Sequence, residues 1–106
     1  MDNNLAVWNA AKSVSTAVAS IITTYRKSKA VKKQELAALE TKIKIYVTQA
    51  RAHAIGEIIR VNIEEITSTQ RYIDQQNLDG IALEMAIEQL HELNCLLRAN
   101  LNNVRT

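Results

Sequence analysis

Glycine and proline are almost missing from this sequence. It has no proline, and its only glycines are Gly56 and Gly80. Phosphate-binding loops and dinucleotide fingerprints need several glycines close together, and oxyanion cradles are typically built from glycine-rich turns or exposed helix starts. The sequence contains no such loop. We therefore predict that the protein is not an enzyme, has no small-molecule substrate and uses no cofactor.

Aromatic residues and cysteine are also scarce. Phenylalanine is absent, and three Tyr and one Trp are the only aromatic residues, so the core must be built from Ile, Leu, Val and Ala. Few rings can stack on bases, which argues against sequence-specific recognition of nucleic acid. The single Cys95 cannot form an intrachain disulfide, which fits a reducing compartment and predicts a cytoplasmic location. No signal peptide is evident, and the uncharged stretch from Ser13 to Tyr25 is shorter than the ~20 residues of a membrane-spanning helix.

The basic and acidic residues are unevenly distributed. Nine of the 13 basic residues lie in residues 1–55, and eight of the 11 acidic residues lie in residues 56–106. This asymmetry can favour folding of one half onto the other, head-to-tail packing between copies, or an anionic partner at the basic end.

The strongest run of one charge is RKSKAVKK at residues 26–33. Its basic residues are Arg26, Lys27, Lys29, Lys32 and Lys33. A solvated charged face is the simplest interpretation. The alternative is loose electrostatic attachment to nucleic acid or to an anionic membrane surface.

Residues 34–76 are predicted to form one long central helix. Apolar residues recur there at every seventh position, which is typical of a helical seam: Ile45, Ala52, Ile59, Ile66 and Ile73. At 1.5 Å per residue this helix would be roughly 64 Å long. Gly56 lies within it and indicates close contact with another helix, with a kink or hinge as the rival explanation. Asn62 lies beside the seam, where it either fixes register or faces solvent.

A second apolar line runs beside this seam. It contains Leu36, Leu39, Ile43, Val47, Ala50, Ala54, Ile58 and Val61. Because a helix with two apolar flanks needs neighbours on both, we expect other polypeptide to cover one of them.

Two further helices are predicted on either side of the long one. Residues 3–28 carry an apolar stripe with heptad-like spacing, formed by Val7, Ala11, Val14, Val18, Ile21 and Tyr25. A turn at residues 77–80, with Asp79 as the N-cap, precedes a last helix at 80–104 that should fold back antiparallel. Residues 26–33 contain no turn signal, so the first and second segments form either one helix or two, and we favour a bend. The expected fold is a single all-α domain, residues 1–106, arranged as a helical hairpin or an elongated three-helix bundle with coiled-coil-like packing.

The spacing of Glu88 and His91 is that of a helical metal-binding motif. Cys95 could add a third ligand, and a hairpin would bring Glu64 and Glu65 opposite. The motif occurs once, however, and the same residues except Cys95 fit the solvated back of the last helix. We therefore expect no metal, and Glu88 and His91 remain weak candidates. His53, four residues before Glu57, is interpreted as a structural polar residue.

These patterns favour association over catalysis. We predict a homo-oligomer, or a subunit that binds another protein, acting as a structural component, adaptor or small regulator. The predicted interface consists of Val7, Val14, Val18, Ile21, Ile45, Ile59, Asn62, Ile66 and Ile73. The alternatives are an anion-binding module that uses residues 26–44 and a metal-binding helical dimer.

Overall fold

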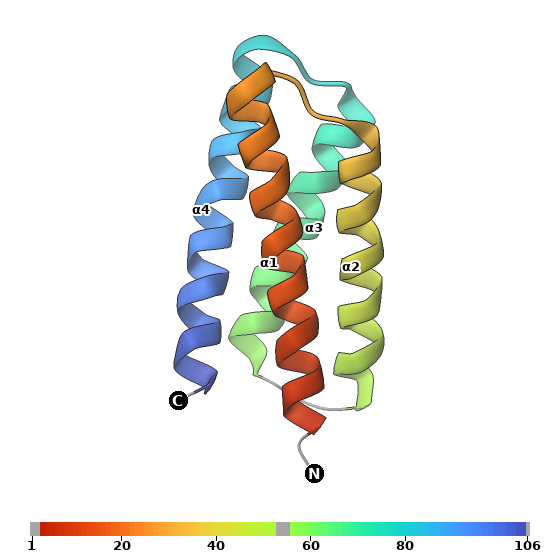
Figure 1. Cartoon of the computed structure of the whole chain (residues 1–106), viewed down its shortest axis with the longest axis vertical. Helices are drawn as coiled ribbons and strands as arrows, with labels where there is room; N and C mark the ends of the chain where they lie inside the picture. The colour runs from red at the N-terminus through yellow and green to blue at the C-terminus, as the bar shows by residue number, and fades with distance from the viewer. Residues whose placement is uncertain (1–2, 53–55, 106) are drawn as a thin grey trace.

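The computed structural model describes residues 3–52 and 56–105. This part of the chain contains four α-helices and no strand: α1 (Asn3–Ser28), α2 (Lys33–Ala52), α3 (Glu57–Gln76) and α4 (Gly80–Arg105). Successive helices run in opposite directions along a bundle whose extents are 46 × 22 × 20 Å (Figure 1). The predicted all-α helical bundle is confirmed, and its first and last helices begin where the sequence placed them.

The prediction of one long helix over residues 34–76 is wrong. Helix α2 ends at Ala52, and α3 begins at Glu57 and runs back alongside the bundle. Gly56 has φ 128° and ψ 145°, a backbone conformation that side-chain-bearing L residues rarely adopt. A Cβ built on Gly56 would meet no atom within 4 Å, so this glycine does not mark a close helix contact. Its role is to change the direction of the chain. Part of each apolar line is thereby buried within one molecule, but Ile45, Val47, Ile58 and Val61 remain exposed.

The connection from α1 to α2 is also a break. Lys29 has φ 57°, and its N–H donates to the carbonyl of Tyr25 over 2.6 Å, which closes the end of α1 with a left-handed residue. The favoured bend in residues 26–33 is therefore confirmed. The Ser28 hydroxyl donates to the carbonyl of Thr24 at 2.9 Å, within α1, and so does not cap α2.

The turn between α3 and α4 lies where the sequence placed it. Asn77 is in the left-handed conformation, with φ 48° and ψ 52°, and ends α3. Helix α4 starts directly after Asp79, whose carbonyl accepts from the N–H of Leu83 at 3.2 Å. Leu78 packs against the core that buries Leu83.

The core lies between the four helices and consists mainly of Ile, Leu, Val and Ala. The apolar stripe of α1 is buried along its length by α2 and α4. Trp8 is also buried, and its indole Nε1 donates to the carbonyl of Leu101 at 2.9 Å, which joins α1 to the end of α4. Ile59, Ile66 and Ile73 are buried from the α3 side.

Polar pairs also lie in the helix interfaces. Asn62 is buried, and its Oδ1 accepts from Asn100 Nδ2 at 2.8 Å across α3 and α4. The solvent-facing alternative for Asn62 is therefore wrong. Ser15 is buried as well, and its hydroxyl accepts from Arg98 Nε at 2.8 Å across α1 and α4. These bonds satisfy groups whose burial without a partner would be unfavourable.

Candidate docking groove

The predicted interface residues are mostly inside the bundle. Eight of the nine are buried by the chain itself: Val7, Val14, Val18, Ile21, Ile59, Asn62, Ile66 and Ile73. They cannot form a partner surface while the bundle is closed, because the break before α3 lets this chain supply its own cover. Ile45 is the exception and remains 46% exposed.

The weak metal candidates Glu88 and His91 lie about one turn apart on α4. Glu88 is exposed, His91 is half-buried, and the Sγ of exposed Cys95 lies 3.8 Å from His91 Nε2. Glu64 points to α2 and is bound to Arg60, so it is not opposite His91. Within residues 3–52 and 56–105, no group of three or more His, Cys, Asp and Glu side chains could hold a metal ion. His53 lies outside the described residues.

The basic run lies at the end of the bundle where α1 turns into α2. All five of its basic residues are exposed: Arg26, Lys27, Lys29, Lys32 and Lys33. Lys33 Nζ is 2.8 Å from Asp74 Oδ1, and Lys29 Nζ lies 5.4 Å from the centroid of the Tyr25 ring. The surface there presents long, exposed cationic side chains, which suit diffuse electrostatic attraction.

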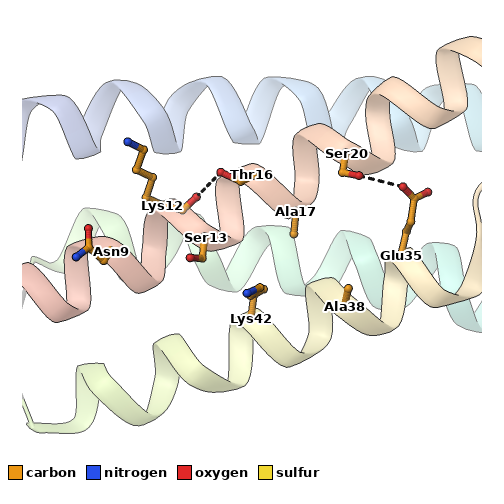
Figure 2. A pocket seen from close by; sticks show the side chains of 9 residues that line it. All are labelled: Asn9, Lys12, Ser13, Thr16, Ala17, Ser20, Glu35, Ala38 and Lys42. Atoms are coloured by element: carbon orange, nitrogen blue, oxygen red, sulfur yellow. Dashed lines mark hydrogen bonds between the residues drawn. The ribbon is translucent and has the colours of Figure 1, made fainter.

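A groove of about 480 Å³ lies between α1 and α2 (Figure 2). Its central contact is at Glu35, whose Oε2 accepts from the hydroxyls of Ser20 at 3.0 Å and Thr24 at 2.9 Å. Glu35 Oε1 is buried and has no hydrogen-bond partner among the described residues. Because these bonds tie α1 to α2, we interpret the cluster as structural.

A larger groove of about 890 Å³ lies between α2 and α3. Helices α2 and α3 pack much less closely than α1 with α2 or α3 with α4. The floor of the groove is apolar and is formed by Ile43, Tyr46, Val47, Ala50 and Ile63. Ile43, Tyr46 and Ile63 are each 4% exposed or less, so the accessible apolar surface of the floor is Val47, which is 43% exposed, and half-buried Ala50. Its lining runs from residue 40 to 51 on α2 and from residue 60 to 71 on α3, a length of roughly 16 Å or about three helical turns.

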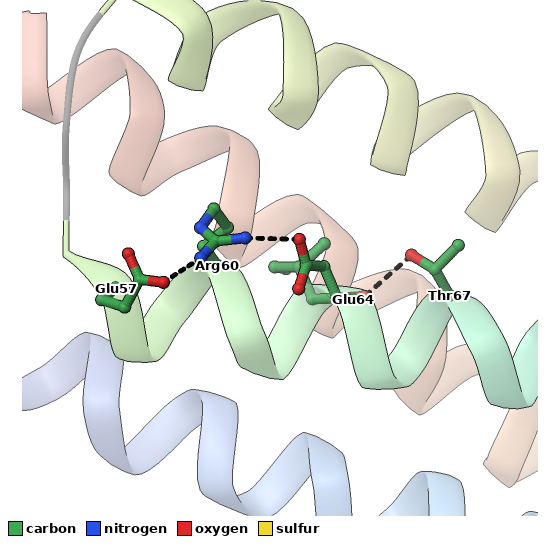
Figure 3. A network of polar contacts seen from close by, with 5 residues as sticks. Glu57, Arg60, Glu64 and Thr67 are labelled. Carbon is green, nitrogen blue, oxygen red and sulfur yellow. Dashed lines mark hydrogen bonds and ion pairs between the residues drawn. The ribbon is translucent and has the colours of Figure 1, made fainter.

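The rims of this groove are charged. Arg60, Glu64 and Thr67 project from α3 toward α2 and away from α4 (Figure 3). Arg60 is paired with Glu57 and with Glu64, whose Oε2 is 2.6 Å from Arg60 Nη1. Arg71 Nη2 reaches Glu40 Oε2 across the groove at 3.3 Å.

The α2 rim carries the uncompensated charge. Lys44 and Arg51 form no ion pair with any residue that the structure describes. Four basic and two acidic side chains line the groove, so it has an excess of positive charge.

Burial raises the pKa of the Tyr46 hydroxyl above its ordinary value, Arg60 opposes this rise, and Glu64 adds to it. Tyr46 therefore remains a neutral part of the floor at physiological pH.

Comparison of the chain with known protein families, curated proteins and solved structures finds no match. Among the residues that the structure describes, one helical stretch, Leu5–Ser28, is by length and composition alone apolar enough to cross a membrane. This span is longer than the Ser13–Tyr25 stretch identified in the sequence. Half of its apolar window is buried in the bundle, where it supplies the α1 side of the core.

The α2–α3 groove was not predicted from the sequence. The sequence identified Val47 and Ala50 as part of an apolar line, but it considered Glu64, one of the α3 side chains along the groove, only as a possible neighbour of His91, and it did not single out Arg60. Only the reversal of the chain before Glu57 places these two sets side by side. Gly56 was the residue that could have indicated this reversal, but the sequence analysis interpreted it as a close contact between helices.

Proposed function

We propose that this protein works by non-covalent association with protein, as a structural component, adaptor or small regulator, and that the α2–α3 groove is its docking surface. The observation that supports this proposal is the accessible apolar surface at Val47 and half-buried Ala50, which lies between the charged rims of the groove. A helix laid along two others is a common recognition mode, in which apolar side chains fill the groove and polar side chains meet its rims.

The size and chemistry of the groove fit such a helix. A length of about three turns accommodates three or four apolar anchors at i, i+3 or i+4 and i+7 spacing. Val47 and Ala50 would contact these anchors, and Lys44 and Arg51 would meet acidic side chains at the rim. The groove holds no paired nucleophile and base among its described residues, so its chemistry is that of recognition.

Self-association is the first form of this proposal to test. Light scattering of the purified protein, measured from micromolar to millimolar concentration and at several ionic strengths, should show an oligomer. A monomer under all these conditions would remove self-association. Because ion pairs at the groove rim are screened by salt, the oligomer should weaken as the ionic strength rises.

The proposed location is the cytoplasm. Cys95 is exposed on α4, and in a reducing compartment its thiol stays free. In an oxidising compartment an exposed single thiol would link two copies covalently.

A second candidate function is loose binding to a polyanion through the basic end of the bundle. It is supported by the exposure of all five basic residues of the run, of which only Lys33 has an ion pair in the part of the chain that the structure describes. Such binding would be independent of the α2–α3 groove.

A further inference from the structure

We propose that the occupant of the α2–α3 groove is the outer face of α4 from a second copy of this chain, so that copies join head to tail. This inference rests on the proposed function and names the partner of the same groove. The chemistry of the α4 face, the charge of the groove and the placement of the two surfaces support it.

The outer face of α4 exposes more apolar surface than a solvated helix needs. Ile81 is 75% exposed, Met85 is 67% exposed and Leu96 is 53% exposed. Residues 81, 85, 88, 92 and 96 are spaced by three or four positions, so they share one side of the helix. This stripe is roughly 22 Å long, which is enough to fill a groove of about three turns.

The same stripe is acidic. Glu88 and Glu92 lie between the apolar residues, and Glu84 lies beside them. None of the three forms an ion pair with a described residue of its own chain. The α4 face therefore offers unpaired carboxylates and apolar anchors, whereas the groove offers the unpaired cations Lys44 and Arg51 above an apolar floor.

Charge also decides between the ways in which two copies could meet. Two grooves facing each other would bring Lys44 and Arg51 of both copies together, and two α4 faces would bring their glutamates together. Like charges across an interface are unfavourable, whereas groove and α4 face are complementary. The favoured contact is therefore heterologous, between different surfaces of the two copies.

The bundle places the two surfaces so that one molecule can use both at once. Helices α2 and α4 occupy opposite corners of the bundle and do not contact each other (Figure 1). A copy that receives α4 from one neighbour can thus present its own α4 to another. Heterologous contacts of this kind produce rings when the rotation closes and open chains when it does not.

The test uses one variant whose α4 face should no longer bind a groove and one whose groove should no longer bind an α4 face. Met85→Asp/Leu96→Asp removes the anchors of the α4 face, and Lys44→Glu/Arg51→Glu reverses the groove rim. We expect each to raise the apparent Kd of assembly about 100-fold or more, as loss of central anchors does. The matched controls are Ile58→Asp/Tyr72→Asp for exposed apolar residues on α3 and Lys27→Glu/Lys42→Glu for exposed cations, and both should assemble like the wild type.

Mixing the two defective variants gives the decisive result. Each variant retains one intact surface, so an equimolar mixture should form a capped 1:1 heterodimer by light scattering or sedimentation, although each alone is monomeric. The altered surfaces are both acidic and should not rescue each other. Heterodimer formation also shows that both variants are folded, and far-ultraviolet circular dichroism measures their helix content directly.

The outcomes separate this inference from the proposed function. Wild-type assembly with monomeric variants and a mixed heterodimer supports the inference. If the wild type assembles but the two variants assemble equally well, or their folded mixture stays monomeric, the α4–groove contact is wrong and self-association stands. If the wild type is monomeric up to millimolar concentration, both self-association and the α4–groove contact are wrong.

Discussion

At the scale of single residues, the buried polar side chains show which helices are paired and in which register, and the heptad pattern of the sequence does not contain this information. The sequence showed Asn62 beside an isoleucine seam, but it could not show Asn100 as its partner, because the register of two helices is a tertiary property. The 2.8 Å bond between their side chains lies across α3 and α4. A buried amide with a partner contributes modestly, whereas the same amide without one is costly.

We therefore predict a strong coupling between Asn62 and Asn100. Asn62→Leu should lower the free energy of unfolding by about 1–3 kcal/mol, because it leaves the Asn100 side chain without its acceptor. The double variant Asn62→Leu/Asn100→Leu should recover part of that loss. Urea unfolding of the wild type, both single variants and the double variant gives the coupling. Additive effects of the two substitutions would mean that the bond contributes little.

Tyr46 predicts a specific dependence of stability on alkaline pH. Burial holds the pKa of its hydroxyl above the ordinary value of 10.0, so the folded state favours the neutral form. Its contribution to stability is fully present below pH 10.0 and is lost as the pH rises through the higher folded-state pKa. Tyr46→Phe removes this titration.

The measurement is the free energy of unfolding of both proteins between pH 8 and pH 11, taken from urea curves. We expect the wild type to lose stability relative to Tyr46→Phe once the pH passes about 10. Tyr72, which is exposed, supplies the control, since Tyr72→Phe should follow the wild-type curve. Parallel curves for wild type and Tyr46→Phe would show that Tyr46 titrates normally.

At the scale of helices, the sequence predicted which faces are apolar better than it predicted where the helices end. The stripe of α1, the start of α4 and the turn at residues 77–80 were all identified, because their spacing and turn residues are local signals. The continuity of residues 34–76 was wrong, since a seven-residue spacing fits a long helix and a folded-back pair equally well. For the same reason, eight of the nine predicted interface residues lie inside the bundle, and the α2–α3 groove could not be predicted before the reversal was known.

The reversal makes Gly56 the most sensitive position between helices. Its φ of 128° lies in a region open essentially to glycine, while a Cβ there would contact nothing within 4 Å. We predict that Gly56→Ala lowers the free energy of unfolding by about 1–3 kcal/mol through backbone strain alone. Urea unfolding followed by circular dichroism measures this effect.

Gly80 provides the comparison for this prediction. Its φ is 54°, a left-handed conformation that asparagine tolerates, and it too has open space around a built Cβ. Gly80→Asn should therefore cost less than Gly56→Ala. A more stable Gly56→Ala variant would instead indicate that residues 34–76 prefer a continuous helix, with α3 released from the bundle.

At the scale of the whole molecule, the charge asymmetry of the sequence becomes a spatial one. The basic pair α1 and α2 packs against the more acidic pair α3 and α4, yet only Lys33–Asp74 and Glu40–Arg71 join the two pairs through ion pairs within the described residues. Exposed ion pairs contribute about 0–1 kcal/mol each, so they do not hold the halves together. Four cations that form no ion pair with a described residue remain at the end where α1 meets α2: Arg26, Lys27, Lys29 and Lys32.

The basic end of the bundle, at residues 26–33, yields a prediction that separates the two candidate functions. If it binds polyanions, the wild type should bind random-sequence duplex DNA at low salt, with an affinity that falls steeply as salt is added. Lys27→Gln/Lys29→Gln/Lys32→Gln should weaken this binding and lower the slope of log K against log salt by about 3, since each phosphate contact contributes about 0.9. Lys33 is left unchanged because it is paired with Asp74.

The same triple variant should assemble like the wild type in light scattering, because none of its three positions lines the α2–α3 groove. The control for DNA binding is Lys44→Gln/Arg51→Gln, which removes two cations elsewhere on the surface and should leave the DNA affinity closer to that of the wild type. Absence of DNA binding by the wild type at low salt would eliminate attachment to nucleic acid. Loss of assembly in the triple variant would instead indicate that the docking surface is the basic end and not the groove, since the charge at the basic end would then be required for association.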